Sequence, residues 1–454
     1  MRIALTILPL APLALQSTAQ LYNYTYDPTN ATLFQLSSDP YLAFLVEAVL
    51  ATTIAEGTSS GEVLRIATQL VPGDLNGSYA PYHWFAEQMT TLAESIDPEV
   101  DPVGAREASF HAASYNRASV ALLVGNASDP RLYEAWTPML EQFATAIALL
   151  KPAPGVPVTI KAPNSSIGAF DIPAYFFKAS ASNESLPTVI VGTGYDEPMQ
   201  DMYHLSCSEI LKRGVNCLLY EGPGQATPRR AGLGFIPDWW SVITPIVDYL
   251  HTRVDVDVDK IVLLGDSFGG LLAPLAASRE HRLSAMVLLD GLPNFRQVLE
   301  EQFPEDVLTL YDSGKEDEFN AAVNEALESD EAPTSYKFVW IYSLWSMKTE
   351  SPYEAWTRLG DFSWNATTAG EIGNLPVYVA KGQDDLSTGN EPELARQYLV
   401  QGRPNGGNLT YYHEFLTSLG AGEHTSIGAE AQVYISVFTW LSQVWGGYKF
   451  TNHL

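Results

Sequence analysis

From about residue 155 onward, short runs of apolar residues alternate with longer segments in which apolar residues recur every three or four positions. The short runs are typical of strands buried on both faces, and the longer segments are typical of amphipathic helices. This alternation predicts an α/β fold with a mostly parallel sheet. We expect eight strands, centred near Val158, Ala174, Val189, Leu218, Val262, Val287, Val377 and Tyr411.

The first third of the chain follows a different pattern. Apolar residues recur there at helical spacing over residues 41–56, 83–96, 105–124 and 131–150. Asp-Pro and Pro-Gly pairs separate these segments, and a proline-rich stretch at 151–155 ends this part of the chain. We therefore predict a helical domain over residues 20–150, followed by a second domain over residues 155–454.

A long insertion is expected inside the second domain, over residues 292–375. A connection of that length in a compact domain usually has its own structure, and lids are a common case. The insertion is rich in aromatic and apolar side chains, at Tyr336, Phe338, Trp340, Ile341, Tyr342, Trp345, Trp356, Phe362 and Trp364. They are interpreted either as the core of a helical lid or as the lining of a pocket for an aromatic or polyketide-like molecule.

The most specific chemical signal lies at residues 260–278. A run of branched aliphatic residues leads into Gly265-Asp266-Ser267-Phe268-Gly269, and a helix of small residues follows from Leu271 to Ser278. A strand, a tight turn with flanking glycines and a helix together form a nucleophile elbow, which exposes the central serine at the strand tip. The pattern predicts Ser267 as a nucleophile.

A serine nucleophile needs a base and an acid, which follow it in the order Ser, acid, His. Residues 375–380 form an expected strand, and Asp385 lies in the loop after it. Asp384 and, more distantly, Asp290 are the rival acids. His424 lies on a glycine-rich loop after the last expected strand and before a terminal helix at 427–445, which predicts it as the base. His413 lies within that strand and is the weaker alternative.

An oxyanion hole completes this type of site, and it is built from backbone N–H groups. Phe268, directly after the nucleophile, is one expected donor. The second is expected after the strand at 188–191, where the chain continues as Gly192-Thr193-Gly194-Tyr195-Asp196. We predict Tyr195 as that donor, with Gly194 as the alternative.

The N-terminus and the glycosylation motifs indicate export. Met1 and Arg2 precede an apolar run over 3–15 and small residues at 17–19, as in a secretory signal peptide cleaved after Ala19. The run is too short to cross a bilayer, so we expect no membrane anchor. Sequons begin at eight positions: Asn23, Asn30, Asn76, Asn126, Asn164, Asn183, Asn365 and Asn408. Together these features predict a soluble, secreted glycoprotein.

The formal net charge of −28 argues against nucleic acid or anionic membranes as partners, because both require basic patches. The sequence contains no motif for a metal ion, a nucleotide or another cofactor, so none is expected. Cys207 and Cys217 are the only cysteines. A disulfide between them is permitted on a secretory route, but the sequence leaves it open. The oligomeric state is also left open.

These motifs together resemble the α/β-hydrolase superfamily. Within it, the chain is similar to the branch that contains 2,6-dihydroxypseudooxynicotine hydrolase and fungal pigment hydrolases that shorten polyketide chains. The resemblance covers most of the chain beyond residue 20 and is carried by the elbow and by residues 113–118, 134–136, 143–146, 194–196, 221–225, 238–240 and 422–424. It implies an eight-stranded sheet with an N-terminal helical cap and a helical lid, and a triad of Ser267, Asp385 and His424.

Two features depart from that branch. Asp266 stands where relatives often have an uncharged residue, and its carboxylate is expected to raise the pKa of His424. A secretory signal is also unusual for the branch. Both departures concern the substrate and the working pH more than the fold.

The expected activity is that of a cofactor-independent serine hydrolase acting on a small apolar or aromatic carbonyl compound. The bond expected to be cleaved is either an ester bond or a carbon–carbon bond next to a ketone. The second alternative is what the resemblance implies. Two other functions remain open: a hydrolase-like cyclase or condensation catalyst of fungal secondary metabolism, and a secreted binding glycoprotein without catalysis.

Overall fold

The computed structural model describes residues 32–33, 35–300, 303–329 and 331–452. The expected signal peptide and the sequons at Asn23 and Asn30 lie outside these residues. Within them, no helix is both long enough and apolar enough to cross a membrane.

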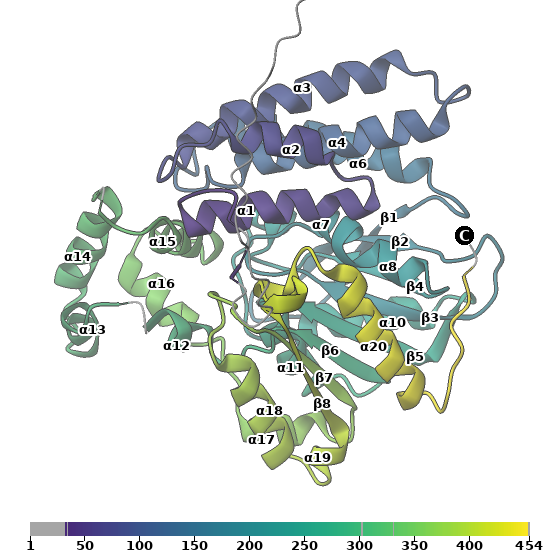
Figure 1. Ribbon diagram of the computed structural model, residues 1–454. Helices are drawn as coiled ribbons and strands as arrows, with labels where there is room; N and C mark the ends of the chain where they lie inside the picture. The colour runs from purple at the N-terminus through teal and green to yellow at the C-terminus, as the bar shows by residue number, and fades with distance from the viewer. Residues whose placement is uncertain (1–31, 34, 301–302, 330, 453–454) are drawn as a thin grey trace, which may run out of the picture.

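An eight-stranded sheet forms the centre of the molecule (Figure 1). Its order is β1-β2-β4-β3-β5-β6-β7-β8, and all neighbours from β4 to β8 are parallel, whereas β1–β2 and β2–β4 are antiparallel. The predicted α/β fold is confirmed, with a strand at every expected position. The strands are β1 Val156–Ala162, β2 Phe170–Phe177, β3 Leu186–Gly192, β4 Asn216–Tyr220, β5 Val256–Asp266, β6 Ala285–Leu289, β7 Val377–Gly382 and β8 Thr410–Phe415.

The central strands are apolar because helices cover both of their faces. Every residue of β3, β4, β6 and β7 is buried, as parallel strands inside an α/β sheet require. The edge strand β8 is only partly buried. The helices that connect or follow the strands are α7 Met199–Met202, a π-helical turn Tyr203–Cys207, α8 Ser208–Leu211, α9 Ala226–Arg230, α10 Trp240–His251, α11 Gly269–Ala277, α18 Glu391–Gln401, α19 Gly406–Leu409 and α20 Glu430–Val444.

The helices before β1 form a layer over one end of the sheet (Figure 1). Helices α1 and α4 begin at an aspartate followed by proline, where Asp39 and Asp101 accept hydrogen bonds from the first free N–H groups. The layer contains α1 Pro40–Ala51, α2 Ser60–Ala67, α3 Tyr79–Ser95, α4 Pro102–Val120, α5 Arg131–Glu134 and α6 Trp136–Ala148.

The segment between β6 and β7 is helical, and all of its helices except the last, α17, lie to one side of the sheet (Figure 1). It contains α12 Phe295–Glu300, α13 Glu305–Asp312, α14 Glu316–Glu328, α15 Thr334–Ser346, α16 Pro352–Leu359 and α17 Ala366–Ile372. One hydrophobic core includes buried side chains of the N-terminal helices, the sheet and this insertion. The division into a cap domain, a hydrolase domain and a lid therefore stays a prediction.

The aromatic side chains of the insertion pack mainly against one another. Trp340 is 1% exposed, and its ring lies 5.4 Å from that of Phe303, 5.8 Å from that of Trp356 and 6.1 Å from that of Phe319, measured between centroids. Buried aromatic clusters of this kind contribute both apolar burial and favourable ring geometry. The contacts support the interpretation of Trp340 as core.

We expect Trp340→Ala to lower the free energy of unfolding by about 3–5 kcal/mol, because it removes a large buried ring and leaves a cavity. Urea denaturation measures this change. The matched control is Trp84→Ala, since the Trp84 side chain is 54% exposed and its loss should cost much less. Unchanged stability together with weaker substrate binding by Trp340→Ala would instead support a pocket role.

The two cysteines lie on adjacent elements. Cys207 ends the π-helical turn and Cys217 belongs to β4, and both are buried, free thiols. The structure therefore holds no disulfide between them.

Candidate active site

The segment around Ser267 has the predicted strand, turn and helix. Ser267 follows β5 directly, has a left-handed backbone with φ of 53°, and precedes α11. A Cβ atom on residue 265 would lie 2.1 Å from the carbonyl oxygen of Gly269, so only glycine fits there. The backbone N–H of Ser267 donates a hydrogen bond to the carbonyl oxygen of Leu289 on the neighbouring strand, at 2.8 Å. These contacts hold the serine at the strand tip.

Three predicted side chains meet at this tip. Nε2 of His424 lies 2.7 Å from Oγ of Ser267, and Nδ1 lies 2.9 Å from Oδ2 of Asp385. The rival acid Asp384 is exposed and accepts a hydrogen bond from the hydroxyl of Thr417 instead. His413 lies in β8, where its ring packs against Phe415. The structure thus brings together Ser267, His424 and Asp385, which are distant in sequence.

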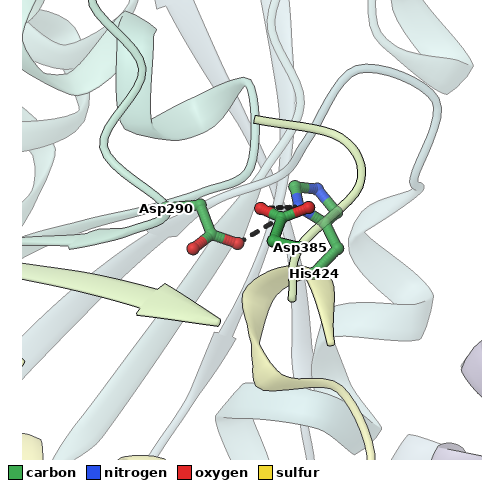
Figure 2. A group of neighbouring side chains, drawn as sticks. All are labelled: Asp290, Asp385 and His424. Carbon is green, nitrogen blue, oxygen red and sulfur yellow. Dashed lines mark hydrogen bonds and ion pairs between the residues drawn. The ribbon is translucent and has the colours of Figure 1, made fainter. Parts of the chain in front are cut away.

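A second carboxylate reaches the same imidazole. Oδ2 of Asp290, directly after β6, lies 3.1 Å from Nδ1 of His424 (Figure 2). In the sequence, Asp290 was only a distant alternative to Asp385, and its contact alongside Asp385 was not predicted. The three ligand-type atoms of these residues lie within 4.8 Å of one another. Since Nδ1 is already hydrogen bonded to the carboxylates, we interpret the group as a hydrogen-bonded cluster and not as a metal site.

Burial and charge set the protonation of this cluster. Burial opposes a positive charge on His424, but the carboxylate of Asp385 and then the contacts with Asp290 raise the pKa of His424 well above its usual value. Burial also opposes ionisation of Asp385, yet the charge and hydrogen bond of His424 lower the pKa of Asp385 to about 2. For Asp290, burial and then the charge of Asp385 raise the pKa to about 6. Asp385 is therefore more readily ionised than Asp290.

The sequence of the chain is similar to those of fungal hydrolases, and its fold is similar to that of a solved hydrolase. No family profile matches the sequence. The chain is 28% identical over 340 residues to the hydrolase acrC of Aspergillus aculeatus, which covers 71% of this chain and 78% of that protein. It is 26% identical over 406 residues to the 20-hydroxy-prefusarin hydrolase FUS2 of Gibberella moniliformis, with 87% and 94% covered.

Among solved structures, 2,6-dihydroxy-pseudo-oxynicotine hydrolase superposes with a TM-score of 0.64 at 17% identity, over 89% of this chain and 98% of that one. The chain has the α/β-hydrolase fold and is similar in sequence to fungal hydrolases. The resemblance expected from the sequence motifs is confirmed, and the eight-stranded sheet is the sheet of that fold.

The loop after β3 lies against Ser267. A Cβ atom on Gly194 would lie 3.1 Å from the Cβ of Ser267, so the main chain approaches the serine closely. The amide of Gln225 braces this loop by donating hydrogen bonds to the carbonyl oxygens of Thr193 at 3.0 Å and Gly194 at 3.3 Å. Gln225 belongs to the 221–225 motif, whose role was not predicted from the sequence.

Tyr195 connects the same loop to the insertion. Its buried hydroxyl donates a hydrogen bond to Ser343 at 2.9 Å and accepts one from Ser346 at 3.1 Å, both on α15. Burial raises the pKa of Tyr195 to about 12, so this hydroxyl keeps its proton. The side chain of Tyr195 therefore anchors the loop, which leaves its backbone N–H as the group for the predicted oxyanion role.

A pocket opens above Ser267 between the sheet and the N-terminal helices. Helix α1 supplies much of its apolar wall, through Leu42, Leu45, Val46, Ala48 and Val49, and Phe44 stands 5.9 Å from the ring of His424. The tryptophans of the insertion do not line it. The sequence of α1 indicated that this helix has apolar contacts on more than one side. Its residues are apolar almost all round, which is typical of a helix that packs on two sides.

The polar side of the pocket is acidic. Arg117 of α4 is paired with Asp201, with Nε and Oδ2 2.7 Å apart. Asp266 and Glu197 also line the pocket and hydrogen bond to each other. Burial raises the pKa of Asp266 to about 7. The negative charges that raise the pKa of His424 are therefore first those of Asp385 and Asp290. Asp266 is a further carboxyl group that interacts electrostatically with His424.

Proposed function

We propose that this α/β-hydrolase is a serine hydrolase in which Ser267 is the nucleophile, His424 the base and Asp385 the orienting acid. The observation that carries the proposal is the continuous hydrogen-bonded chain from the Ser267 hydroxyl through His424 to Asp385, beside a pocket. A nucleophile, a base within hydrogen-bond reach and an orienting group for the base are the three parts that this chemistry requires.

In this mechanism, Nε2 of His424 takes the hydroxyl proton as Oγ of Ser267 attacks a carbonyl carbon. The N–H groups of Tyr195 and Phe268 hold the oxyanion of the tetrahedral intermediate. The intermediate collapses as His424 returns the proton to the leaving group, which is an alcohol or a carbanion stabilised by a ketone. Water, deprotonated by His424, then attacks the acyl group and releases a carboxylic acid and free Ser267.

The proposed substrate is a small apolar carbonyl compound of polyketide type. Two observations support this choice. The wall formed by α1 is aliphatic, so it suits a hydrocarbon chain. The relative FUS2 has a name that assigns it 20-hydroxy-prefusarin as substrate. We propose an ester, or a carbon–carbon bond next to a ketone, as the bond that is cleaved.

Covalent labelling tests this function without knowledge of the natural substrate. A fluorophosphonate probe should react with the native protein, and peptide mass spectrometry should locate the adduct on Ser267. Labelling elsewhere, or none at all, would contradict the proposal. With a turned-over substrate in H₂¹⁸O, one labelled oxygen in the acid product indicates hydrolysis. An unlabelled, rearranged product would indicate cyclisation.

We also propose that the protein is secreted and glycosylated. The signal-like N-terminus supports this, and so does the exposure of every sequon asparagine among the described residues, at Asn76, Asn126, Asn164, Asn183, Asn365 and Asn408. A glycan requires such exposure. Protein recovered from the culture medium should lose mass on treatment with an N-glycosidase. Protein retained inside the cell with its full N-terminus would contradict the proposal.

A further inference from the structure

Asp290 lies in a demanding position at the tip of β6. Its side chain is fully buried, and its backbone is left-handed, with φ of 61°. Few residues other than glycine adopt this conformation, although aspartate tolerates it better than most. The carboxylate of Asp290 lies beside the side chains of Asp385 and His424 (Figure 2).

The carboxylate of Asp290 has three neighbours. Oδ1 accepts a hydrogen bond from the backbone N–H of Gly382 at 3.3 Å, and Oδ2 accepts one from the backbone N–H of Thr425. Oδ2 also lies 3.1 Å from Nδ1 of His424. Gly382 ends β7 and Thr425 follows the base. Asp290 therefore contacts both the acid loop and the base loop.

Two carboxylates thus face one nitrogen that carries a single proton. Placing two buried carboxylates side by side is costly unless a positive charge or hydrogen bonds compensate them. The imidazolium formed when His424 takes the Ser267 proton supplies such a charge. The charge compensation favours an electrostatic role for Asp290 toward His424, in addition to its hydrogen bonds with the two loops.

We propose that Asp290 is a second positioning residue for His424, which shares the Nδ1–H hydrogen with Asp385 and stabilises the imidazolium. The inference rests on the proposed function, since it assigns His424 as the base. The Nδ1 proton stays on nitrogen throughout, and only the proton between Ser267 and Nε2 moves. Asp290 touches neither the substrate nor the reacting atoms.

If Asp290 and Asp385 share the Nδ1–H hydrogen of His424, both carboxylates affect the pKa of His424. The carboxyl groups with an electrostatic effect on it are Asp385 after β7, Asp290 after β6, Asp266 at the end of β5, Asp196 after β3 and Glu423 on its own loop. A base must be neutral to accept a proton, so the acid limb of the pH–rate profile follows the pKa of His424. Removing one of these negative charges should move that limb to lower pH.

We therefore expect Asp290→Asn to shift the acid limb of fluorophosphonate labelling at Ser267 down by about one pH unit, which corresponds to about 1.4 kcal/mol. Asp385→Asn should lose only about 10- to 100-fold in labelling rate, because Asp290 still orients the imidazole. The double variant should lose about 10⁴-fold, as triads without an acid do. Asp384→Asn is the matched control, since it removes a neighbouring carboxylate that does not contact His424, and it should leave the profile unchanged.

Two outcomes would overturn the proposal: an Asp290→Asn profile that matches the native one, or an Asp385→Asn rate as low as that of the double variant. The second arm keeps Asp290 intact, so it decides the question even if Asp290→Asn folds poorly.

If the native protein is not labelled, the proposal that Ser267 is the nucleophile is contradicted, but the role of Asp290 can still be tested separately. In that case NMR titration of ¹³C-labelled histidine reports His424 directly. The pKa of His424 should fall in Asp290→Asn and stay constant in Asp384→Asn. An unchanged His424 pKa would overturn the sharing of Nδ1–H on its own.

Discussion

The Ser267→Ala variant is expected to lose at least about 10⁵-fold in kcat/KM on a p-nitrophenyl ester. Losses of this size follow removal of the nucleophile in serine hydrolases, because no covalent intermediate can form. The activity that remains reflects the oxyanion hole and substrate binding alone. Spectrophotometric release of p-nitrophenol measures the rate, and the fluorophosphonate adduct should disappear with it.

The control for this variant is Ser278→Ala. Ser278 is buried at the end of α11, and its hydroxyl donates a hydrogen bond to the carbonyl oxygen of Leu275 on the same helix. It should retain nearly native kcat/KM. A Ser267→Ala variant with close to native turnover would remove Ser267 from the nucleophile role, whatever the other side chains of the site do.

The strands could be predicted because they are buried on both faces and have a uniform apolar sequence. Helix boundaries were less certain. The helix expected at 131–150 is divided into α5 and α6 near Ala135. Pro138 has no N–H to donate to the carbonyl oxygen of Glu134, and its ring crowds that carbonyl. The short helix α2 was not predicted, because eight residues carry little periodic signal.

The convergence of Ser267, Asp385 and His424 could be predicted because each residue follows a strand in a loop with its own local signal. Asp290 and Asp385 show what sequence order and spacing cannot predict. β6 and β7 are neighbours in the sheet, so Asp290 and Asp385 both leave strand tips on the same side. Sequence order and spacing cannot say whether one carboxylate or both reach the imidazole, since that depends on the backbone of each loop. The left-handed turn at Asp290 is visible only in three dimensions.

The lining of the pocket was harder to predict than the convergence of these three side chains, for a related reason. Its wall comes from α1, more than 200 residues before Ser267 in the sequence. The aromatic insertion, for which both a core and a lining role were open, packs mainly as core. An apolar helix face indicates that another element packs against it, but it does not identify that element. Contacts between such distant segments are set by the packing of whole layers.

The second large effect is expected at His424. We expect His424→Ala to lose about 10⁵- to 10⁶-fold in kcat/KM on the same ester, because no other side chain is hydrogen bonded to the Ser267 hydroxyl in the described part of the chain. The Ser267→Ala/His424→Ala double variant should be no slower than either single variant, since the two residues act as one unit. Multiplied losses in the double variant would contradict a shared proton-transfer step. Far-ultraviolet circular dichroism provides the control for folding. If the losses coincide, Ser267 and His424 perform a single step, which is what the 2.7 Å contact between Oγ and Nε2 implies.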